Sequence, residues 1–174
     1  MRVGINGFGR IGRSVFRVLN GRDDIHIVAI NDIFDKEALT YLLKYDTVMG
    51  RFPGAISLNG DMLHAGSQTV KLVAEKSPSE LPWKELGVDV VIESTGIFRM
   101  RSQLEDHINA GAKKVVLTVP AKDDIDYTVV LGVNHQGLNS EHKIVSNASC
   151  TTNCLAPMAK VLNDNFGIEL GVIN

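Results

Sequence analysis

Two short segments contain residue types and spacings that could perform chemistry. Residues 7–12 (GFGRIG) form a GxGxxG pattern, and residues 149–154 (SCTTNC) place a cysteine among small residues with hydrogen-bonding side chains. Glycine-rich turns let backbone N–H groups approach a phosphate group closely. A cysteine can act as a nucleophile when it ionises to the thiolate. The sequence therefore offers one candidate anion-binding turn and one candidate nucleophile.

The context of the glycine turn fits a dinucleotide-binding site. The turn follows the apolar residues 2–6 and precedes a segment in which apolar residues recur at helical spacing. Residues 25–30 are a second apolar segment, rich in β-branched side chains, which would complete a β-α-β unit. Asp32 lies 20 residues after Gly12, at the end of this second strand. This context predicts a dinucleotide site, with a turn that binds no ligand as the alternative.

Each residue of the turn has an expected role. Gly7 would permit the tight turn, Gly9 would let the backbone approach the pyrophosphate, and Gly12 would let the helix pack closely against the strand. The backbone N–H groups of Arg10 and Ile11 would lie at the positive end of the helix, where they can bind the pyrophosphate.

Asp32 is expected to select the form of the dinucleotide. Its carboxylate can accept hydrogen bonds from the ribose hydroxyls of adenosine, and its charge would repel a 2′-phosphate. The sequence therefore predicts NAD rather than NADP. The alternative role for Asp32 is to cap the next helix, for which Asp35 is the better-placed residue.

Cys150 is expected at the N-terminus of a helix. Unpaired N–H groups and the helix dipole stabilise a thiolate there, and the hydrogen-bonding side chains of Thr151 and its neighbours could bind an oxyanion. Cys154 lies one turn further on and is expected to be packed rather than reactive. The spacing alone leaves a buried structural thiol as the alternative for Cys150.

Strands and helices alternate along the chain, which predicts an α/β fold with a doubly wound, mostly parallel sheet. Further helices are expected over residues 36–44 and 102–110, and a hairpin with a type I′ turn over residues 55–65, centred on Asn59-Gly60. Further strands are expected over residues 70–74, 88–93, 114–118, 128–131 and 143–146.

Two domains are expected, because the sequence pattern changes near Asn147. Residues 1–148 would form the NAD-binding domain. Residues 149–174 would begin a second, catalytic domain, with the cysteine helix reaching about Asn165 and a strand over residues 166–174. We expect the chain to stop within this second domain.

Composition argues against several classes of partner. The 174 residues carry a formal net charge of −2, with none of the basic surplus that favours nucleic acid or anionic membranes. No apolar run approaches the roughly 20 residues that a membrane-spanning helix needs. Two cysteines are too few for a disulfide scaffold and argue against a metal site, and they fit the reducing cytoplasm.

The chain resembles the glyceraldehyde-3-phosphate dehydrogenase family along its whole length. The resemblance rests first on residues 6–13 (NGFGRIGR) together with residues 149–154 (SCTTNC). It extends through residues 31–32 (ND), 43–47 (LKYDT), 93–96 (ESTG), 111–114 (GAKK) and 132–134 (GVN).

The resemblance implies roles for individual residues. Arg10, Ile11 and Asp32 would hold the adenosine end of NAD, and Cys150 would be the nucleophile. The residues near the nicotinamide would be Lys76, Thr95 and Thr118, and those that flank the aldehyde and help to form its phosphate sites would be Ser149 and Thr151.

The implied reaction oxidises glyceraldehyde 3-phosphate to 1,3-bisphosphoglycerate in glycolysis, through a thiohemiacetal and a thioester that inorganic phosphate captures. The family is tetrameric, and its general-base histidine is expected after residue 174, so the chain by itself is expected to be inactive. Residues 81–86 (LPWKEL) and 144–147 (IVSN) also resemble erythrose-4-phosphate dehydrogenase. That enzyme, and an NAD-binding module without catalysis, are the alternatives.

Overall fold

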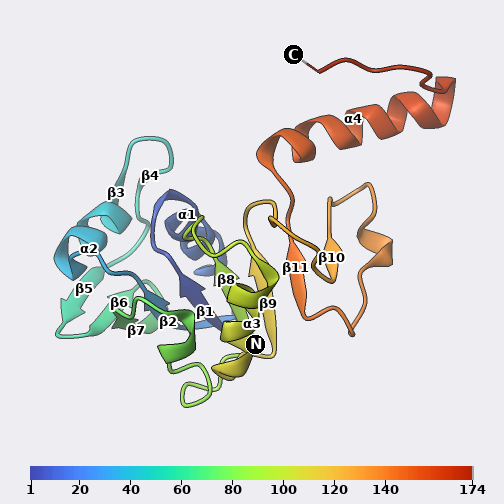
Figure 1. Cartoon of the computed structure of the whole chain (residues 1–174). Helices are drawn as coiled ribbons and strands as arrows, with labels where there is room; N and C mark the ends of the chain where they lie inside the picture. The colour runs from blue at the N-terminus through green and yellow to red at the C-terminus, as the bar shows by residue number, and fades with distance from the viewer. Residues whose placement is uncertain (174) are drawn as a thin grey trace.

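A nine-stranded sheet forms the body of the molecule in the computed structural model, which describes residues 1–173 (Figure 1). Its strands are β1 (Arg2–Asn6), β2 (His26–Asn31), β5 (Ile56–Asn59), β6 (Met62–Ala65), β7 (Gln68–Val73), β8 (Val90–Glu93), β9 (Lys114–Leu117), β10 (Tyr127–Thr128) and β11 (Ile144–Ser146). They lie in the order β10-β11-β9-β8-β1-β2-β7-β6-β5. All neighbours pair in parallel from β10 to β7, whereas β7, β6 and β5 pair antiparallel. The predicted mostly parallel α/β sheet is confirmed.

The helices are α1 (Arg10–Leu19), α2 (Lys36–Lys44), α3 (Arg101–Asn109) and α4 (Cys150–Phe166), with two short 3-10 turns, η1 (Pro78–Glu80) and η2 (His135–Gly137). A separate two-stranded ribbon pairs β3 (Tyr45–Asp46) with β4 (Gly50–Arg51). In the part of the chain that the structure describes, every helix is too short or too polar to cross a bilayer.

Helices α1 and α3 cover opposite faces of the sheet. Strand β1 alternates between the two faces: Val3 and Ile5 pack with Phe16 of α1, whereas Gly4 lies against Trp83, which contacts α3 through His107. A Cβ atom at Gly4 would lie 2.8 Å from the Trp83 ring, so the indole fills the space that a side chain would otherwise take. The opposite placement of the two crossovers makes the sheet doubly wound, as predicted.

The predicted hairpin is present, but its turn differs from the expected one. Asn59 pairs with Met62, so the two turn residues are Gly60 and Asp61 rather than Asn59 and Gly60. Gly60 has φ +59°, and Asp61 does not have a positive φ. A type I′ turn needs positive φ at both central residues, so that prediction was wrong. The hairpin extends the main sheet through β7, where it forms the antiparallel edge.

The C-terminal segment differs most from the expectation. Helix α4 begins at the predicted Cys150 and extends away from the sheet, and it has no buried residue (Figure 1). Residues 167–173 form no strand, and the last residue of the predicted strand, Asn174, lies outside the described residues. A strand needs hydrogen-bond partners, and no described strand lies beside this segment. For the same reason Cys154 is exposed rather than packed, because nothing in residues 1–173 covers the face on which it lies.

Candidate functional site

The direction of the chain's crossovers reverses between β1 and β8, which are neighbours in the sheet. In doubly wound folds the carboxyl ends of the strands open a crevice at this point, and ligands bind there. A cavity of about 250 Å³ opens at this place in the structure. Its lining residues are Asn6, Gly7, Gly9, Asn31, Asp32, Ile33, Glu75, Lys76, Ser94, Thr95, Ile97 and Phe98.

The three glycines of the turn have different local requirements. Gly7 has φ +88°, and a Cβ atom there would lie 2.7 Å from the backbone nitrogen of Thr95. A Cβ atom at Gly12 would lie 2.1 Å from the carbonyl oxygen of Gly7, so only glycine lets α1 approach β1 this closely. A Cβ atom at Gly9 would meet no atom within 4 Å. Gly9 therefore leaves open space on the cavity side of the turn, as a bound pyrophosphate requires.

The N-terminus of α1 has free capacity to bind an anion. Its N-cap residue is Gly9, no side chain caps the helix, and its first turn contains no acidic residue. The first backbone N–H groups of the helix therefore lack a partner within the described residues, which leaves them available to a phosphate. Arg13 adds positive charge behind the turn and donates to the carbonyl oxygen of Phe8 at 3.0 Å. Burial lowers the pKa of the Arg13 guanidinium, although the nearby Asp46 carboxylate acts in the opposite direction.

Asp32 lies directly after β2 and lines the cavity. One carboxylate oxygen accepts from the backbone N–H of Phe8 at 2.7 Å, and the other accepts from that of Phe34 at 2.9 Å. Each oxygen keeps a further lone pair with which a ribose hydroxyl could bond. Asp35, not Asp32, caps α2 by accepting from the backbone N–H of Ala38. Asp32 thus fixes the glycine turn while it lines the cavity.

The residues predicted near the nicotinamide follow three strands, of which β8 and β9 are neighbours, whereas β7 is separated from β8 by β1 and β2. Thr95 comes just after β8 and lines the cavity, as does the exposed Lys76, which follows β7. Thr118 follows β9; its backbone N–H and its hydroxyl both donate to the carbonyl oxygen of Glu93, at 3.0 and 3.1 Å. Thr118 is not among the cavity-lining residues, but this pair of bonds ties it to the end of β8.

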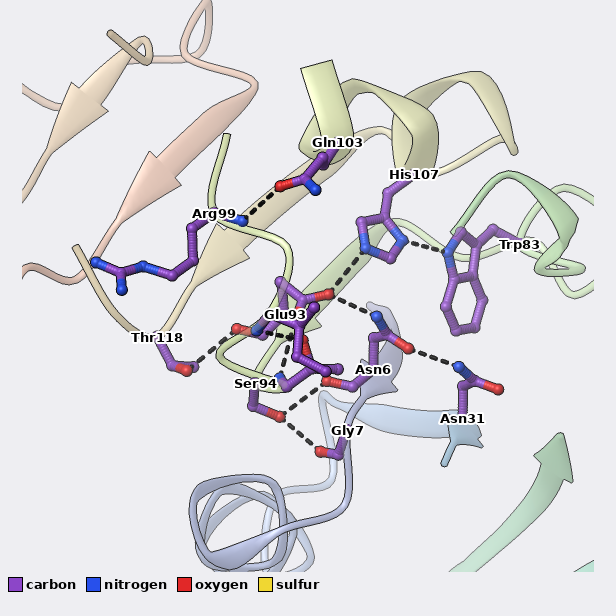
Figure 2. Close-up of polar contacts among 12 residues, drawn as sticks. Asn6, Gly7, Asn31, Trp83, Glu93, Ser94, Arg99, Gln103, His107 and Thr118 are labelled. Carbon is purple, nitrogen blue, oxygen red and sulfur yellow. Dashed lines mark hydrogen bonds and ion pairs between the residues drawn. The ribbon is translucent and has the colours of Figure 1, made fainter. Parts of the chain in front are cut away.

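A buried polar network lies directly behind the cavity wall (Figure 2). Glu93 is completely buried, and its carboxylate accepts hydrogen bonds from Asn6, from the ring of His107, and from both the N–H and the hydroxyl of Thr95. Trp83 donates from its indole nitrogen to His107 at 2.9 Å. Sequence reasoning assigned no role to Glu93, which it noted only as part of residues 93–96 (ESTG).

The candidate nucleophile lies on the surface. Cys150 is the first residue of α4 and is exposed, and the Ser149 hydroxyl caps the helix by accepting from the backbone N–H of Thr152 at 2.9 Å. Ala148, just before this cap, is the one residue other than glycine with positive φ in residues 1–173, at 58°. This conformation is unfavourable for an L-residue, and it turns the chain sharply from β11 into α4.

The cysteine segment is attached to the carboxyl edge of the sheet. The backbone N–H of Asn147 donates to the carbonyl oxygen of Leu117, the residue before Thr118, at 2.9 Å. The side chain of Asn153 donates to the carbonyl oxygens of Asn147 and Ser149, at 2.7 and 2.9 Å. Helix α4 therefore begins at the carboxyl edge of the sheet, which is the edge that holds the cavity (Figure 1).

Comparison with known proteins identifies the family. Residues 1–101 match a family model described as "Glyceraldehyde 3-phosphate dehydrogenase, NAD binding domain", and residues 149–174 match one described as "Glyceraldehyde 3-phosphate dehydrogenase, C-terminal domain". The chain belongs to the glyceraldehyde 3-phosphate dehydrogenase family. Its N-terminal region is an NAD-binding domain, and NAD is its cofactor.

Curated members of the glyceraldehyde 3-phosphate dehydrogenase family are similar along the whole chain. The glyceraldehyde-3-phosphate dehydrogenase of Xanthobacter flavus is 54% identical over 173 residues, which cover 98% of this chain and 51% of that protein. That of Thermotoga maritima is 53% identical over 174 residues (99% and 52%), and the cytosolic one of Trypanosoma brucei brucei is 54% identical over 173 residues (99% and 52%). The chain spans about half the length of these relatives.

The family's predicted site residues fall into two groups in this structure. Gly7, Gly9, Asp32, Lys76 and Thr95 meet in the cavity. The remaining ones lie outside its lining: they are Arg10, Ile11 and Gly12 in α1, Thr118 after β9, and Ser149, Cys150 and Thr151 at the start of α4.

Several cavity-lining residues were missed from the sequence. Asn6 and Asn31 end β1 and β2, and Ser94 follows β8, so their positions at strand ends were the signal that could have found them. Ile33, Ile97 and Phe98 carry no such signal. No group of three or more His, Cys, Asp or Glu residues among residues 1–173 is placed to hold a metal ion.

Proposed function

We propose that this chain supplies the NAD site and the nucleophile for the oxidative phosphorylation of glyceraldehyde 3-phosphate, the glycolytic step that yields 1,3-bisphosphoglycerate. The observation that carries the proposal is the arrangement at the carboxyl edge of the sheet, where the dinucleotide cavity opens and an exposed cysteine begins a capped helix. Membership of the family supports the choice of reaction.

The cofactor would lie across the reversal point of the sheet. The open side of Gly9 and the N–H groups of Arg10 and Ile11 would bind the pyrophosphate, with Gly7 and Gly12 holding the turn in place. Asp32 would accept from the adenosine ribose. The order of the strands then directs the nicotinamide half of the dinucleotide over the ends of β8 and β9, toward Thr95 and Thr118. Lys76 follows β7 and lies on the opposite wall of the cavity.

Cys150 would perform covalent catalysis. Its thiolate sulfur attacks the aldehyde carbon, and a C–S bond forms as the carbonyl π-bond breaks, which gives the oxyanion of a thiohemiacetal. The carbonyl bond re-forms as a hydride leaves this carbon, and bound NAD would supply the hydride acceptor. A phosphate oxygen then attacks the resulting thioester, the C–S bond breaks, and the thiolate is restored with an acyl phosphate as product.

The flanking hydroxyls would orient the substrate. Ser149 and Thr151 lie on either side of Cys150 at the positive end of α4, where N–H groups and hydroxyls favour phosphate and oxyanion groups.

We assign residues 1–148 to the NAD-binding domain and residues 149–174 to a catalytic domain. The match of residues 149–174 to the C-terminal family model supports this division. We also propose a cytoplasmic, homotetrameric protein, as is typical of the family.

A stoichiometric reaction tests the proposal. The chain is mixed with NAD, glyceraldehyde 3-phosphate and phosphate, and NADH formed per chain is measured beside a Cys150→Ser control, with NAD binding measured separately by calorimetry. We expect saturable NAD binding in both proteins and sustained turnover in neither, with a slow burst of up to one NADH per chain only where Cys150 is present. A faster burst with erythrose 4-phosphate than with glyceraldehyde 3-phosphate would favour the alternative dehydrogenase. NAD binding without any NADH would favour a binding module, and no NAD binding would refute the proposal.

A further inference from the structure

Glu93 is a buried carboxylate to which the proposed reaction assigns no role. It ends β8 and has no exposed surface. Four hydrogen-bond donors point at its side chain: Asn6, His107 and two groups of Thr95. Three of these groups, the Asn6 amide, the ring of His107 and the backbone N–H of Thr95, can only donate to the Glu93 carboxyl, and this pattern favours an ionised carboxylate.

The positive charge that could neutralise Glu93 is absent from its direct contacts. Trp83 can only donate from its indole nitrogen, so Nδ1 of His107 must accept and carries no proton. The proton of the ring is then on Nε2, from which it is donated to Glu93 at 3.0 Å. His107 is therefore neutral in this arrangement. Within residues 1–173, no lysine or arginine forms an ion pair with Glu93.

The network also fixes where this charge lies relative to the cavity. The side chain of Glu93 holds Thr95, whose hydroxyl in turn accepts from the backbone N–H of Ile97 at 3.1 Å, and both residues line the cavity. The main-chain carbonyl of Glu93 holds Thr118. Figure 2 shows Glu93 between Thr118 and the residues of β1. Glu93 is thus the residue that connects the two threonines at the ends of β8 and β9.

We infer that the buried charge of Glu93 makes this site prefer the oxidised, cationic nicotinamide of NAD⁺ to the reduced, neutral ring of NADH. The inference rests on the proposed function, in which the nicotinamide half lies over the ends of β8 and β9. A fixed negative charge in a low-dielectric surrounding stabilises a nearby cation and does nothing comparable for a neutral ring. Glu93 is therefore a positioning residue that also determines specificity for the redox state.

The magnitude follows from Coulomb's law. For an assumed separation of roughly 10 Å and an effective dielectric constant of about 20 to 40, one charge changes the relative affinity by on the order of fourfold to fifteenfold. The other charged residues of the cavity wall, Asp32, Glu75 and Lys76, stay the same when only Glu93 is changed. Their effects therefore cancel when the variant is compared with the unaltered chain.

The test is the ratio of the dissociation constants of NADH and NAD⁺, measured by calorimetry for the unaltered chain and for Glu93→Gln. Glutamine keeps the size of the side chain but removes the charge. We expect this ratio to fall by about fourfold to fifteenfold in Glu93→Gln. A purely structural role would weaken the binding of both cofactors by the same factor, and an unchanged ratio would overturn the inference.

Glu141→Gln is the matched control. Glu141 is exposed in the loop that Lys114 holds at the amino end of β9, on the side of the sheet away from the cavity. Glu141→Gln changes the net charge by the same amount as Glu93→Gln. We expect the ratio of the NADH and NAD⁺ dissociation constants to stay at its original value in this control. A fall in Glu141→Gln equal to that in Glu93→Gln would show a nonspecific effect of net charge and would refute the inference.

A second measurement needs no variant, in case Glu93→Gln does not fold. The unaltered chain is titrated with an NAD analogue in which the cationic pyridinium ring is replaced by a neutral benzamide ring. We expect NAD⁺ to bind more tightly than this analogue, and equal affinities would overturn the inference. If neither NAD⁺ nor NADH binds, the proposed function itself fails, whereas binding of both with no preference that depends on ring charge defeats the inference alone.

Discussion

A methyl group at Gly12 would lie 2.1 Å from the carbonyl oxygen of Gly7 and 3.0 Å from the hydroxyl oxygen of Ser94. The first of these atoms belongs to the backbone and cannot rotate away. Gly12→Ala must therefore displace α1 from β1, and overpacking of this kind costs about 3 kcal/mol at the upper end of its usual range. Alanine is the better helix former by about 1 kcal/mol, so we expect a net loss of about 2 kcal/mol in the free energy of unfolding.

The same displacement would damage the cavity. The carbonyl oxygen of Gly7 accepts from the Ser94 hydroxyl at 2.6 Å, and the N–H of Gly7 donates to the carbonyl oxygen of Asn31 at 2.8 Å. All three residues line the cavity. We therefore expect Gly12→Ala to weaken NAD binding as well as to lower stability, as measured by calorimetry and by urea unfolding followed by circular dichroism.

Gly9→Ala is the matched control, because it adds the same methyl group three residues before Gly12, at a position without a close contact. The new group would meet no atom within 4 Å, and Gly9 has φ −70°, which alanine adopts readily. We expect a change in stability below about 1 kcal/mol, since alanine is only a poorer N-cap, but a clear loss of NAD affinity. Unchanged stability of Gly12→Ala, or unchanged NAD affinity of Gly9→Ala, would refute this account of the turn.

Three further predictions concern other parts of the molecule. Asp32→Asn removes the charge that would repel a 2′-phosphate, so the ratio of NADP to NAD affinity is expected to rise in calorimetric titrations. Burial of Asp126 opposes its ionisation, but hydrogen bonds from two backbone N–H groups and from Arg101 outweigh it and lower the pKa of Asp126. This stabilisation is complete above the unfolded pKa of about 3.9 and is lost as the pH falls through the lower folded pKa. Asp126→Asn should therefore lower the free energy of unfolding at pH 7. The variant should also lose less of this free energy than the unaltered chain as the pH is lowered, as measured by urea unfolding. Cys150 lies at the N-terminus of α4, and Cys154 lies one turn further on. Iodoacetamide should therefore label Cys150 several-fold faster than Cys154, as measured by mass spectrometry. Equal labelling of the two cysteines would argue against activation of Cys150 by the helix.

The glycine turn shows how far the sequence alone could lead. Its position between an apolar strand and a helix predicted a β-α-β unit, and the structure contains β1, α1 and β2 at those places. Local rules sufficed there, because the strand and helix periodicities and the need for glycine in a tight turn are set by neighbouring residues. The same rules placed the start of α4 at Cys150.

Local rules failed where the outcome depends on partners distant in the chain. The segment after Phe166 is apolar enough for a strand, yet strand pairing is decided by a neighbour, and the described residues provide none. The exposure of Cys154 has the same origin, because the spacing of residues on a helix says which face they share but not what covers that face.

The sequence by itself determined the fold class, the dinucleotide turn and the family, because these depend on short-range patterns that few other chains share. Only the tertiary structure revealed the buried network around Glu93. Its contacts with Asn6 and His107 join residues 87 and 14 positions apart in the chain. No periodicity in the sequence indicates that a carboxylate will be buried among neutral donors, because burial and partner choice are decided by how strands and helices pack together.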